Sequence, residues 1–143
     1  MVELPEPSSA ADQLAHRVIG AAIQVHRVLG PGLLESLYEE ALSVEFEHLG
    51  IPHQRQVSIP ATYRNRVIGR FRCDLVADGR VLVEIKAATG IANVHVAQVI
   101  TYLKLLNLEL GLLLNFNRPT LAQGIRRVIP GSSGVSPSPA WRL

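Results

Sequence analysis

The 143-residue chain has little of what would mark several specialised classes of protein. Its single cysteine, Cys73, excludes an internal disulfide and a zinc cluster built from cysteines. Only two of its 14 basic residues are lysines, Lys86 and Lys104. No apolar run reaches the roughly 18 residues that a membrane-spanning helix needs, and no N-terminal stretch resembles a cleaved signal peptide. These absences predict a cytoplasmic protein without a membrane segment.

The composition is that of one folded domain. Hydrophobic residues make up 48% of the chain and charged residues 18%, which is typical of a globular protein and not of a disordered one. The net charge of +2 is too small to indicate a nucleic-acid partner by itself. We expect an N-terminal arm over residues 1–11, a single domain over 12–129 and a flexible Pro/Ser/Gly-rich tail over 130–143.

Hydrophobic periodicity predicts two helices in the N-terminal third. Apolar residues recur every three or four positions from Ser8 to Leu29, and the following Gly30-Pro31-Gly32 should end that helix. A second helix should run from about Leu33 to Leu49, with Gly50 ending it. Its apolar face is expected to contain Leu34, Leu37, Tyr38, Ala41, Leu42, Val44 and Phe46. Glu39, Glu40, Glu45 and Glu47 are expected on its solvated face.

The pattern then changes to the alternation of β-strands. Three antiparallel strands are predicted, over residues 56–59, 67–76 and 81–85. A third helix should start at Asn93 and close before Gly111, followed by a buried strand over residues 112–116. Residues 124–129 are expected to add an optional last strand. The predicted order is therefore ααβββαβ(β).

The second and third strands form a hairpin whose loop length decides which residues share a face. A two-residue loop at Asp78-Gly79 would place the Asp74 carboxylate among buried aliphatic side chains. A three-residue loop, 77–79, instead pairs Asp74 with Leu82 and is the better register. One face then carries Cys73, Leu75, Val81, Val83 and Ile85. The other carries Arg72, Asp74, Val76, Arg80, Leu82, Glu84 and Lys86.

The polar face brings two carboxylates and an amine together. In this register Asp74 lies diagonal to Glu84, within about 7–8 Å, and Lys86 projects from the same side. Two carboxylates at such a separation could share one Mg²⁺, and Lys86 could orient or deprotonate a water, which an arginine could not do. The alternative is a solvated polar face with an incidental ion pair, since exposed strands often carry Glu and Lys together.

Two helices could add groups to this face. In the third helix, the polar residues His95, Gln98 and Tyr102 form one stripe, which either lies over the acidic face of the hairpin or marks a surface edge. In the second helix, Glu35 sits in the first turn, one turn before Glu39, where its position relative to the sheet is most easily fixed.

These motifs resemble the GxxExxY protein family of the PD-(D/E)XK nuclease-like superfamily. Residues 32–38, Gly-Leu-Leu-Glu-Ser-Leu-Tyr, match the motif that names the family. Asp74 followed by Glu84-Ile85-Lys86 is similar to the Asp…Glu-x-Lys core, and residues 98–102 resemble a Gln-x-x-x-Tyr helix motif. The resemblance covers residues 12 to 129. One departure is Cys73, which stands where the superfamily's name has proline.

The resemblance implies a restriction-endonuclease-like α/β (α+β) core, with a mixed central sheet flanked by helices, and a metal-dependent phosphodiesterase. It implies that Asp74 and Glu84 bind Mg²⁺ or Mn²⁺ and that Glu35 completes the acidic cluster. Lys86 would assist the water, and Gln98 and Tyr102 would support the substrate or Lys86. The expected partner is nucleic acid, DNA or RNA. A homodimer, or a separate motor or recognition protein, is compatible with so small a chain.

A second hypothesis is a catalytically silent nucleic-acid-binding or regulatory module that retains the nuclease fold. Its basis is a group of arginines in and near the hairpin that could contact phosphates: Arg64, Arg66, Arg70, Arg72 and Arg80. Salt-dependent binding that ignores EDTA would favour this module, whereas cleavage that requires a divalent ion would favour the nuclease.

Overall fold

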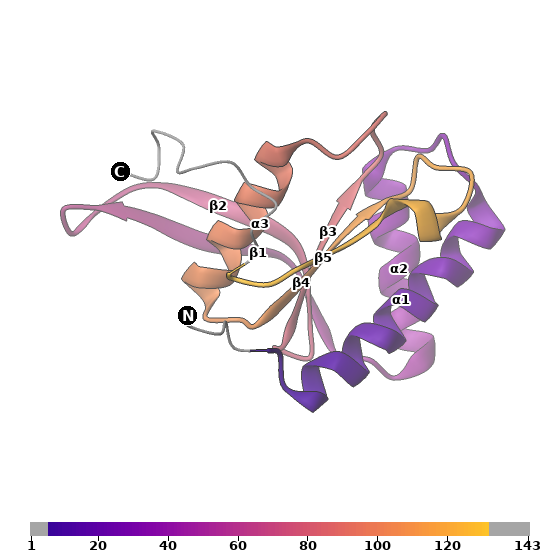
Figure 1. The fold of residues 1–143 in the computed structure, drawn as a ribbon, viewed down its shortest axis with the longest axis horizontal. Coiled ribbons are helices and arrows are strands. Elements are labelled where there is room, and N and C mark those ends of the chain that lie inside the picture. The colour runs from indigo at the N-terminus through magenta and orange to yellow at the C-terminus, as the bar shows by residue number, and fades with distance from the viewer. Residues whose placement is uncertain (1–5, 132–143) are drawn as a thin grey trace.

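The computed structural model describes residues 6–131, which form an α+β fold built on one mixed sheet (Figure 1). The elements are, in order, α1 (Ser9–Leu29), α2 (Glu35–Leu49), β1 (His53–Tyr63), β2 (Arg66–Ala77), β3 (Val81–Lys86), α3 (Asn93–Leu106), β4 (Leu110–Asn115), a 3-10 helix η1 (Leu121–Gly124) and β5 (Ile125–Val128). The predicted order, including the optional last strand, is confirmed. Most of the predicted tail, from residue 132 onward, lies outside the described residues. No helix within residues 6–131 is long and apolar enough to span a membrane.

The five strands lie side by side in the order β1-β2-β3-β4-β5. The pairs β1–β2, β2–β3 and β4–β5 are antiparallel, whereas β3 and β4 are parallel and are joined through α3. α1 and α2 cover one face of this sheet and α3 covers the other (Figure 1). The central strands are therefore buried on both sides.

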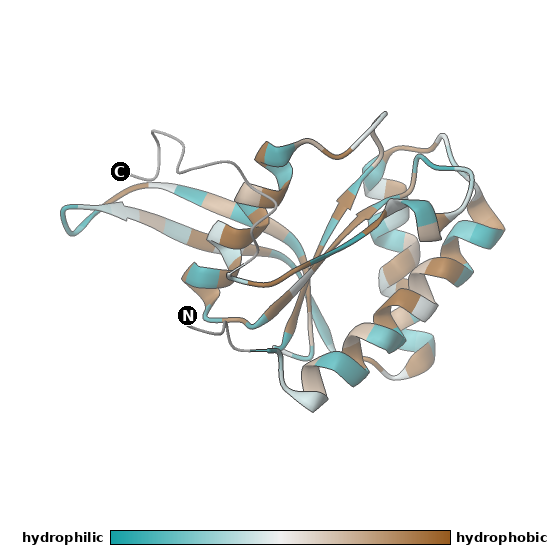
Figure 2. Cartoon of the chain, in the orientation of Figure 1, coloured by the Kyte–Doolittle hydropathy of each residue, from teal (hydrophilic) through white to brown (hydrophobic). Residues whose placement is uncertain are grey.

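Apolar side chains fill both sides of the sheet. In Figure 2 the central strands are largely brown, the colour of hydrophobic residues. Between the sheet and α1/α2 lie side chains such as Leu75, Val83 and Leu112, and between the sheet and α3 lie Leu82 and Leu113. Alternate residues of one strand thus enter opposite cores. Gly111 of β4 lets α3 approach closely, since a Cβ there would lie 2.9 Å from Val99.

The ends of the first two helices follow local signals in the sequence. The Ser8 side chain accepts a hydrogen bond from the Ala11 N–H and caps α1. Gly50 ends α2 in the left-handed conformation, with φ 70°, where glycine carries no Cβ penalty. The end of α2 at Gly50 was predicted from residue type alone.

The prediction of which residues form the apolar face of α2 was partly wrong. Tyr38, Leu42 and Phe46 are buried, as expected, but Leu34, Leu37 and Val44 are exposed. Because α2 carries apolar residues on more than one side, its sequence alone does not show which side meets α1 and the sheet. The buried stripe also includes Glu39 and Ser43.

The β2–β3 register differs by two residues from the predicted one. Ala77 pairs with Val81 and Leu75 with Val83, so the three-residue loop is 78–80 and not 77–79. Both Asp78 and Gly79 adopt positive φ in this loop. Continuing the observed register places Asp74 directly opposite Glu84, so the prediction of a diagonal pair was wrong.

One assignment to the apolar face of the hairpin was also wrong. Cys73 is fully buried, as expected of a small core residue, but it belongs to the cluster beneath α3 together with Val76 and Leu82. Burial, and then the negative charge of Glu84, raise the pKa of the Cys73 thiol to about 12. The thiol therefore stays protonated and contributes packing.

Candidate active site

The two predicted carboxylates meet where β2 and β3 separate. The regular ladder between these strands ends at the Leu75–Val83 pair. Beyond it, the Asp74 N–H donates to Glu84 Oε1 at 2.8 Å, and the Ile85 N–H donates to Asp74 Oδ2 at 2.8 Å. Each carboxylate therefore takes the place of a backbone carbonyl of the neighbouring strand. This exchange satisfies the buried N–H groups and holds both acids at one point of the sheet.

The surroundings of this acid pair disfavour two negative charges. Glu84 is only 4% exposed. Burial, followed by the proximity of Asp74, raises its pKa to about 8. Burial also raises the pKa of Asp74, although the hydrogen bond from the Ile85 N–H opposes the shift. A bound cation would stabilise the charged form of both groups.

Lys86 lies at the end of β3, on the same side as Glu84. Its charge favours the ionised forms of both Asp74 and Glu84. β3 is fixed here by β4: Lys86 pairs with Asn115, and the Phe116 N–H donates to the Lys86 carbonyl at 2.9 Å. Lys86 is half-buried, so its amine is accessible from a pocket.

That pocket, of about 450 Å³, lies between α3 and the strands and brings two predicted site residues together. It is lined by Phe71, Lys86, Val94, His95, Gln98 and Thr101. The His95 and Gln98 part of the predicted polar stripe therefore faces Lys86 and is not a surface edge.

Tyr102 occupies a different environment from the rest of the stripe. It is 3% exposed, and its ring lies 5.4 Å from that of Phe71, within the core beneath α3. Burial, and then the negative charge of Glu84, raise its pKa to about 12, so the hydroxyl remains protonated. Tyr102 is thus near the acid pair electrostatically but does not line the pocket.

The loop before α2 explains the spacing of the Gly-x-x-Glu-x-x-Tyr sequence. Gly32 adopts φ 98°, which favours glycine. The Tyr38 hydroxyl donates to the Gly30 carbonyl at 2.5 Å and accepts from the Leu33 N–H at 3.1 Å. Tyr38 therefore closes the loop that starts α2.

Closing this loop directs Glu35 toward the end of β3. Its Oε1 accepts a hydrogen bond from the Ala87 N–H at 3.2 Å. Its negative charge contributes to the raised pKa of Glu84. The structure thus brings Glu35, Glu84 and Lys86 to one end of the sheet.

Glu39 and Gln56 are site neighbours that the sequence analysis missed. Glu39 was expected on the solvated face but is buried, where its carboxylate accepts from Arg55 at 3.0 Å and from Gln56 Nε2 at 2.5 Å. Gln56 also points its amide at Asp74 Oδ1, at 3.4 Å. The available signal was the one-turn spacing between Glu35 and Glu39, which places both on one side of a helix.

Gln56 holds this position in a strained conformation. It lies within β1 but adopts φ 50°, and the β1–β2 ladder skips the pair that it would form with Asp74. A residue with a Cβ in the left-handed region costs about 1–2 kcal/mol. This backbone conformation directs the Gln56 side chain toward two acids, and its amide donates to the carboxylates of both Glu39 and Asp74.

Asn115 supports the segment that follows Lys86. It is buried, its amide donates to the Ala88 carbonyl at 3.0 Å, and its carbonyl oxygen accepts from the Ala88 N–H at 3.2 Å. The one polar residue in the apolar run of β4 thus fixes the loop after β3.

Asp74 and Glu84 form a pair of carboxylates and not a complete set of metal ligands. Within residues 6–131, no three His, Cys, Asp or Glu side chains gather closely enough to hold a metal ion by themselves. Asp74 and Glu84 nevertheless fit a dication, because Glu84 Oε2 accepts no hydrogen bond from the described residues and because the pKa of both the half-buried Asp74 and the buried Glu84 is raised. Mg²⁺ commonly takes one or two carboxylates and completes its shell with waters and substrate phosphates.

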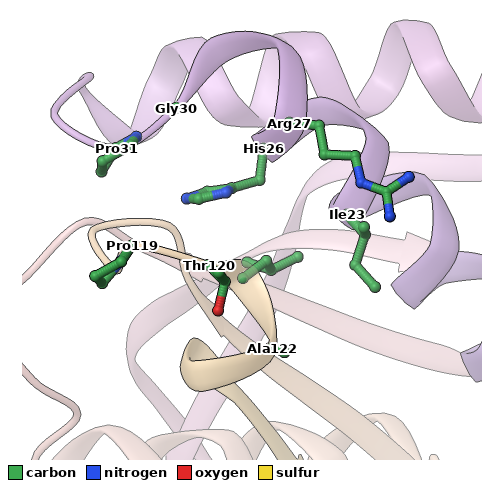
Figure 3. A pocket seen from close by; sticks show the side chains of 9 residues that line it. Ile23, His26, Arg27, Gly30, Pro31, Pro119, Thr120 and Ala122 are labelled. Carbon is green, nitrogen blue, oxygen red and sulfur yellow. The ribbon is translucent and has the colours of Figure 1, made fainter.

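A second hollow, of about 440 Å³, lies on the other side of the sheet, between the end of α1 and η1 (Figure 3). Ile23, Pro31, Pro119 and Leu121 are among its lining residues. His26 also lines it, but its Nε2 already pairs with the Phe116 carbonyl at 3.1 Å. This hollow contains none of the predicted site residues, and its histidine has a structural partner.

Comparison with known proteins agrees with this geometry. A family model described as "PD-(D/E)XK nuclease superfamily" matches residues 12–128, which include all six predicted site residues. No curated protein and no solved structure shows a significant match. The match covers most of the chain, and the mixed sheet with helices on both faces is consistent with a restriction-endonuclease-like fold. The chain belongs to the PD-(D/E)XK nuclease superfamily.

Proposed function

We propose that this protein is a nuclease that hydrolyses phosphodiester bonds of nucleic acid with the help of Mg²⁺ or Mn²⁺. The observation that carries the proposal is the reciprocal hydrogen bonding of Asp74 and Glu84, which fixes a half-buried and a buried carboxylate beside Lys86. Superfamily membership supports nuclease chemistry and a nucleic-acid substrate.

Asp74 and Glu84 are the proposed ligands of the ion. Glu35 is the proposed third acid of the site, outside the Asp74–Glu84 pair, because its charge contributes to the raised pKa of Glu84 and its carboxylate is held by the Ala87 N–H. When bound, the ion neutralises charge on the phosphate and lowers the pKa of a bound water. The raised pKa of both acids means that the cation also relieves the repulsion between them.

Lys86 is the proposed partner of the attacking water. It is half-buried and next to two acids, and among residues 6–131 it and His95 are the basic side chains that line the pocket beneath α3. A lysine in this position can orient a water, take its proton, or offset the negative charge that develops on the phosphate. Gln98 lines the same pocket and could hold the substrate or the Lys86 amine by hydrogen bonding.

Tyr102 has an indirect role in this proposal. Because it is buried against Phe71 and its hydroxyl stays protonated, it supports the wall of the pocket near Glu84. We therefore propose that it positions the site, whereas Gln98 contacts the substrate.

Cleavage assays on the purified full chain test the proposal. Plasmid, linear duplex and single-stranded substrates are incubated with Mg²⁺, with Mn²⁺ or with EDTA. We expect cleavage that requires the divalent ion and is lost in the double variant Glu84→Ala, Lys86→Ala. The matched control is Glu47→Ala, Lys104→Ala, which removes the same residue types from exposed positions.

Equal cleavage by the wild type and the Glu84/Lys86 variant would refute the assignment, because the cleavage would then come from a contaminant or from another site. Salt-dependent binding without cleavage, unchanged by EDTA, would instead support the silent binding module. A crystal grown with Mn²⁺ adds a second readout, since the proposal requires an ion between Asp74 and Glu84.

A further inference from the structure

The outer part of the β1–β2 hairpin, residues 58–72, projects past α3 and away from α1 and α2 (Figure 1). We call this segment, residues 58–72, the arm; it is a different segment from the N-terminal arm expected over residues 1–11. Its strands pair from Ser58–Arg72 to Tyr63–Arg66, with a bulge near Ala61 and Thr62. At the inner end, Ile59 and Phe71 pack beneath α3. Among the described residues 6–131, no helix packs on either face of the outer end, which is therefore a projecting two-stranded ribbon in this part of the chain.

The arm is positively charged over its whole length. It carries Arg64, Arg66, Arg70 and Arg72, all exposed. None of the four forms an ion pair within residues 6–131. The sequence contains no Asp or Glu from residue 48 to residue 73. Charges that are solvated for solubility alone are usually mixed in sign, so a run of one sign indicates a partner of opposite charge.

The tip of the arm combines this charge with exposed apolar surface. Tyr63, Val67 and Ile68 are 56%, 59% and 69% exposed. The turn between the strands has positive φ at both Arg64 and Asn65, the geometry of a type I′ turn. Arg64 accepts this conformation although glycine or asparagine suits it better, and its guanidinium lies 5.8 Å from the Tyr63 ring centroid.

The arm begins at the candidate active site. Arg72 is two residues from Asp74 along β2, and Arg66 is eight residues from it. At about 3.3 Å per residue, the arm reaches roughly 26 Å from the acid pair. A duplex rises about 3.4 Å per base pair on each strand, so this reach corresponds to about eight base pairs on one side of the cleaved bond.

From this geometry we propose that the arm is a DNA-binding ribbon that enters the major groove of a duplex beside the cleavage site. The inference rests on the proposed function for the class of substrate. The major groove of B-form DNA accepts a two-stranded ribbon, and apolar side chains can contact thymine methyl groups there. The major groove of an RNA duplex is too deep and narrow for side chains to read. The arm therefore selects duplex DNA over duplex RNA.

Binding measured without cleavage tests the arm independently of catalysis. The full chain is titrated in EDTA against fluorescent 24-base-pair duplexes of DNA and RNA with the same sequence, over a range of salt concentrations. Two arm variants are used, Arg70→Gln, Arg72→Gln and Arg64→Gln, Arg66→Gln. The matched control is Arg27→Gln, Arg126→Gln, which removes two exposed arginines from α1 and β5.

We expect each arm variant to bind duplex DNA at least tenfold more weakly than the wild type. The slope of log affinity against log salt should become shallower by about 1.8, because two phosphate contacts are lost. The control should match the wild type, and RNA should bind more weakly throughout. Unchanged melting temperatures would show that the variants fold.

Three results would overturn the inference: arm variants that lose no more affinity than the control, equal losses on DNA and RNA duplexes, or unchanged DNA binding together with arm-dependent binding to phosphatidylserine vesicles. Failure of the proposed function looks different. A protein that binds DNA through the arm but never cleaves it would keep this inference and refute the nuclease. A nuclease whose cleavage and DNA affinity are unchanged in the arm variants would keep the proposed function and refute this inference.

Discussion

Asp74 and Glu84 are bound to each other's strands: the Asp74 N–H donates to the Glu84 carboxylate, and the Ile85 N–H donates to the Asp74 carboxylate, each at 2.8 Å. The sheet opens at this point, and its missing backbone bonds are replaced by the acids themselves. This arrangement positions the two groups without a loop that could move. It also places the buried Glu84 next to a second acid, which affects the stability of the protein.

The first prediction concerns pH. Folding raises the pKa of Glu84 from 4.5 to about 8, so between these values the folded protein holds a proton that the unfolded chain has lost. In the absence of metal, the free energy of unfolding should therefore fall as pH rises from 5.5 to 8.5, by at most about 1.4 kcal/mol per pH unit for this group. Urea unfolding in EDTA at several pH values measures the slope.

The variant Glu84→Gln should flatten this dependence, because glutamine cannot ionise but can still accept from the Asp74 N–H. The exposed-site control Glu47→Gln should keep the wild-type slope. A stability that rises with pH in the wild type would contradict the assignment of a raised pKa.

The second prediction concerns Lys86. Lys86→Arg keeps the positive charge but cannot give up a proton, so we expect cleavage to fall by about 100-fold or more if the amine acts on the water. Substrate affinity measured in EDTA should change little. Lys104→Arg, at an exposed position, should cleave like the wild type. Full activity of Lys86→Arg would restrict Lys86 to an electrostatic role.

The third prediction concerns Gln56 as a positioning residue. Gln56→Ala removes the bonds to Glu39 and Asp74, so we expect lower cleavage together with a higher Mn²⁺ concentration for half-maximal activity. Gln56→Gly should lose activity similarly but be more stable than Gln56→Ala by about 1 kcal/mol, because glycine relieves the strained φ. Equal stability of the two variants would argue against strain.

The exposed neighbour Gln54 provides the control for the third prediction. Gln54→Ala should change neither the metal dependence nor the stability, since the Gln54 side chain forms no hydrogen bond with the described residues. A metal dependence that shifts equally in Gln54→Ala would mean that β1 acts as a whole and not through the Gln56 amide.

The fourth prediction concerns the loop before α2. Tyr38→Phe removes the hydroxyl that bonds to Gly30 and Leu33, leaving two half-buried backbone groups without that partner. We expect a loss of about 1–3 kcal/mol in the free energy of unfolding. Chemical denaturation measures it, with the exposed Tyr63→Phe as the matched variant that should be unchanged. Similar stability of both variants would show that the hydroxyl does not fix the loop.

The sequence alone determined the elements of this fold, because their signals are local. Helical periodicity and the glycines at positions 30 and 50 depend on residues within one or two turns. The alternation in residues 67–76 and 81–85 likewise indicated a hairpin with polar and apolar faces. The motif spacing also indicated Asp74, Glu84 and Lys86 as one group, since residues two apart on a strand share a side.

Only the tertiary structure decided the relationships between elements. The register of β2 on β3 depends on a loop with two positive-φ residues, and it moved Asp74 from diagonal to opposite Glu84. The burial of Glu39 depends on which side of α2 meets the sheet. That side is determined by packing against α1, and Arg55 from β1 pairs with the buried carboxylate. A free basic arm beside the site appears only when α3 is seen to cover the inner end of the hairpin and not its tip, because long-range packing is not encoded in any local pattern.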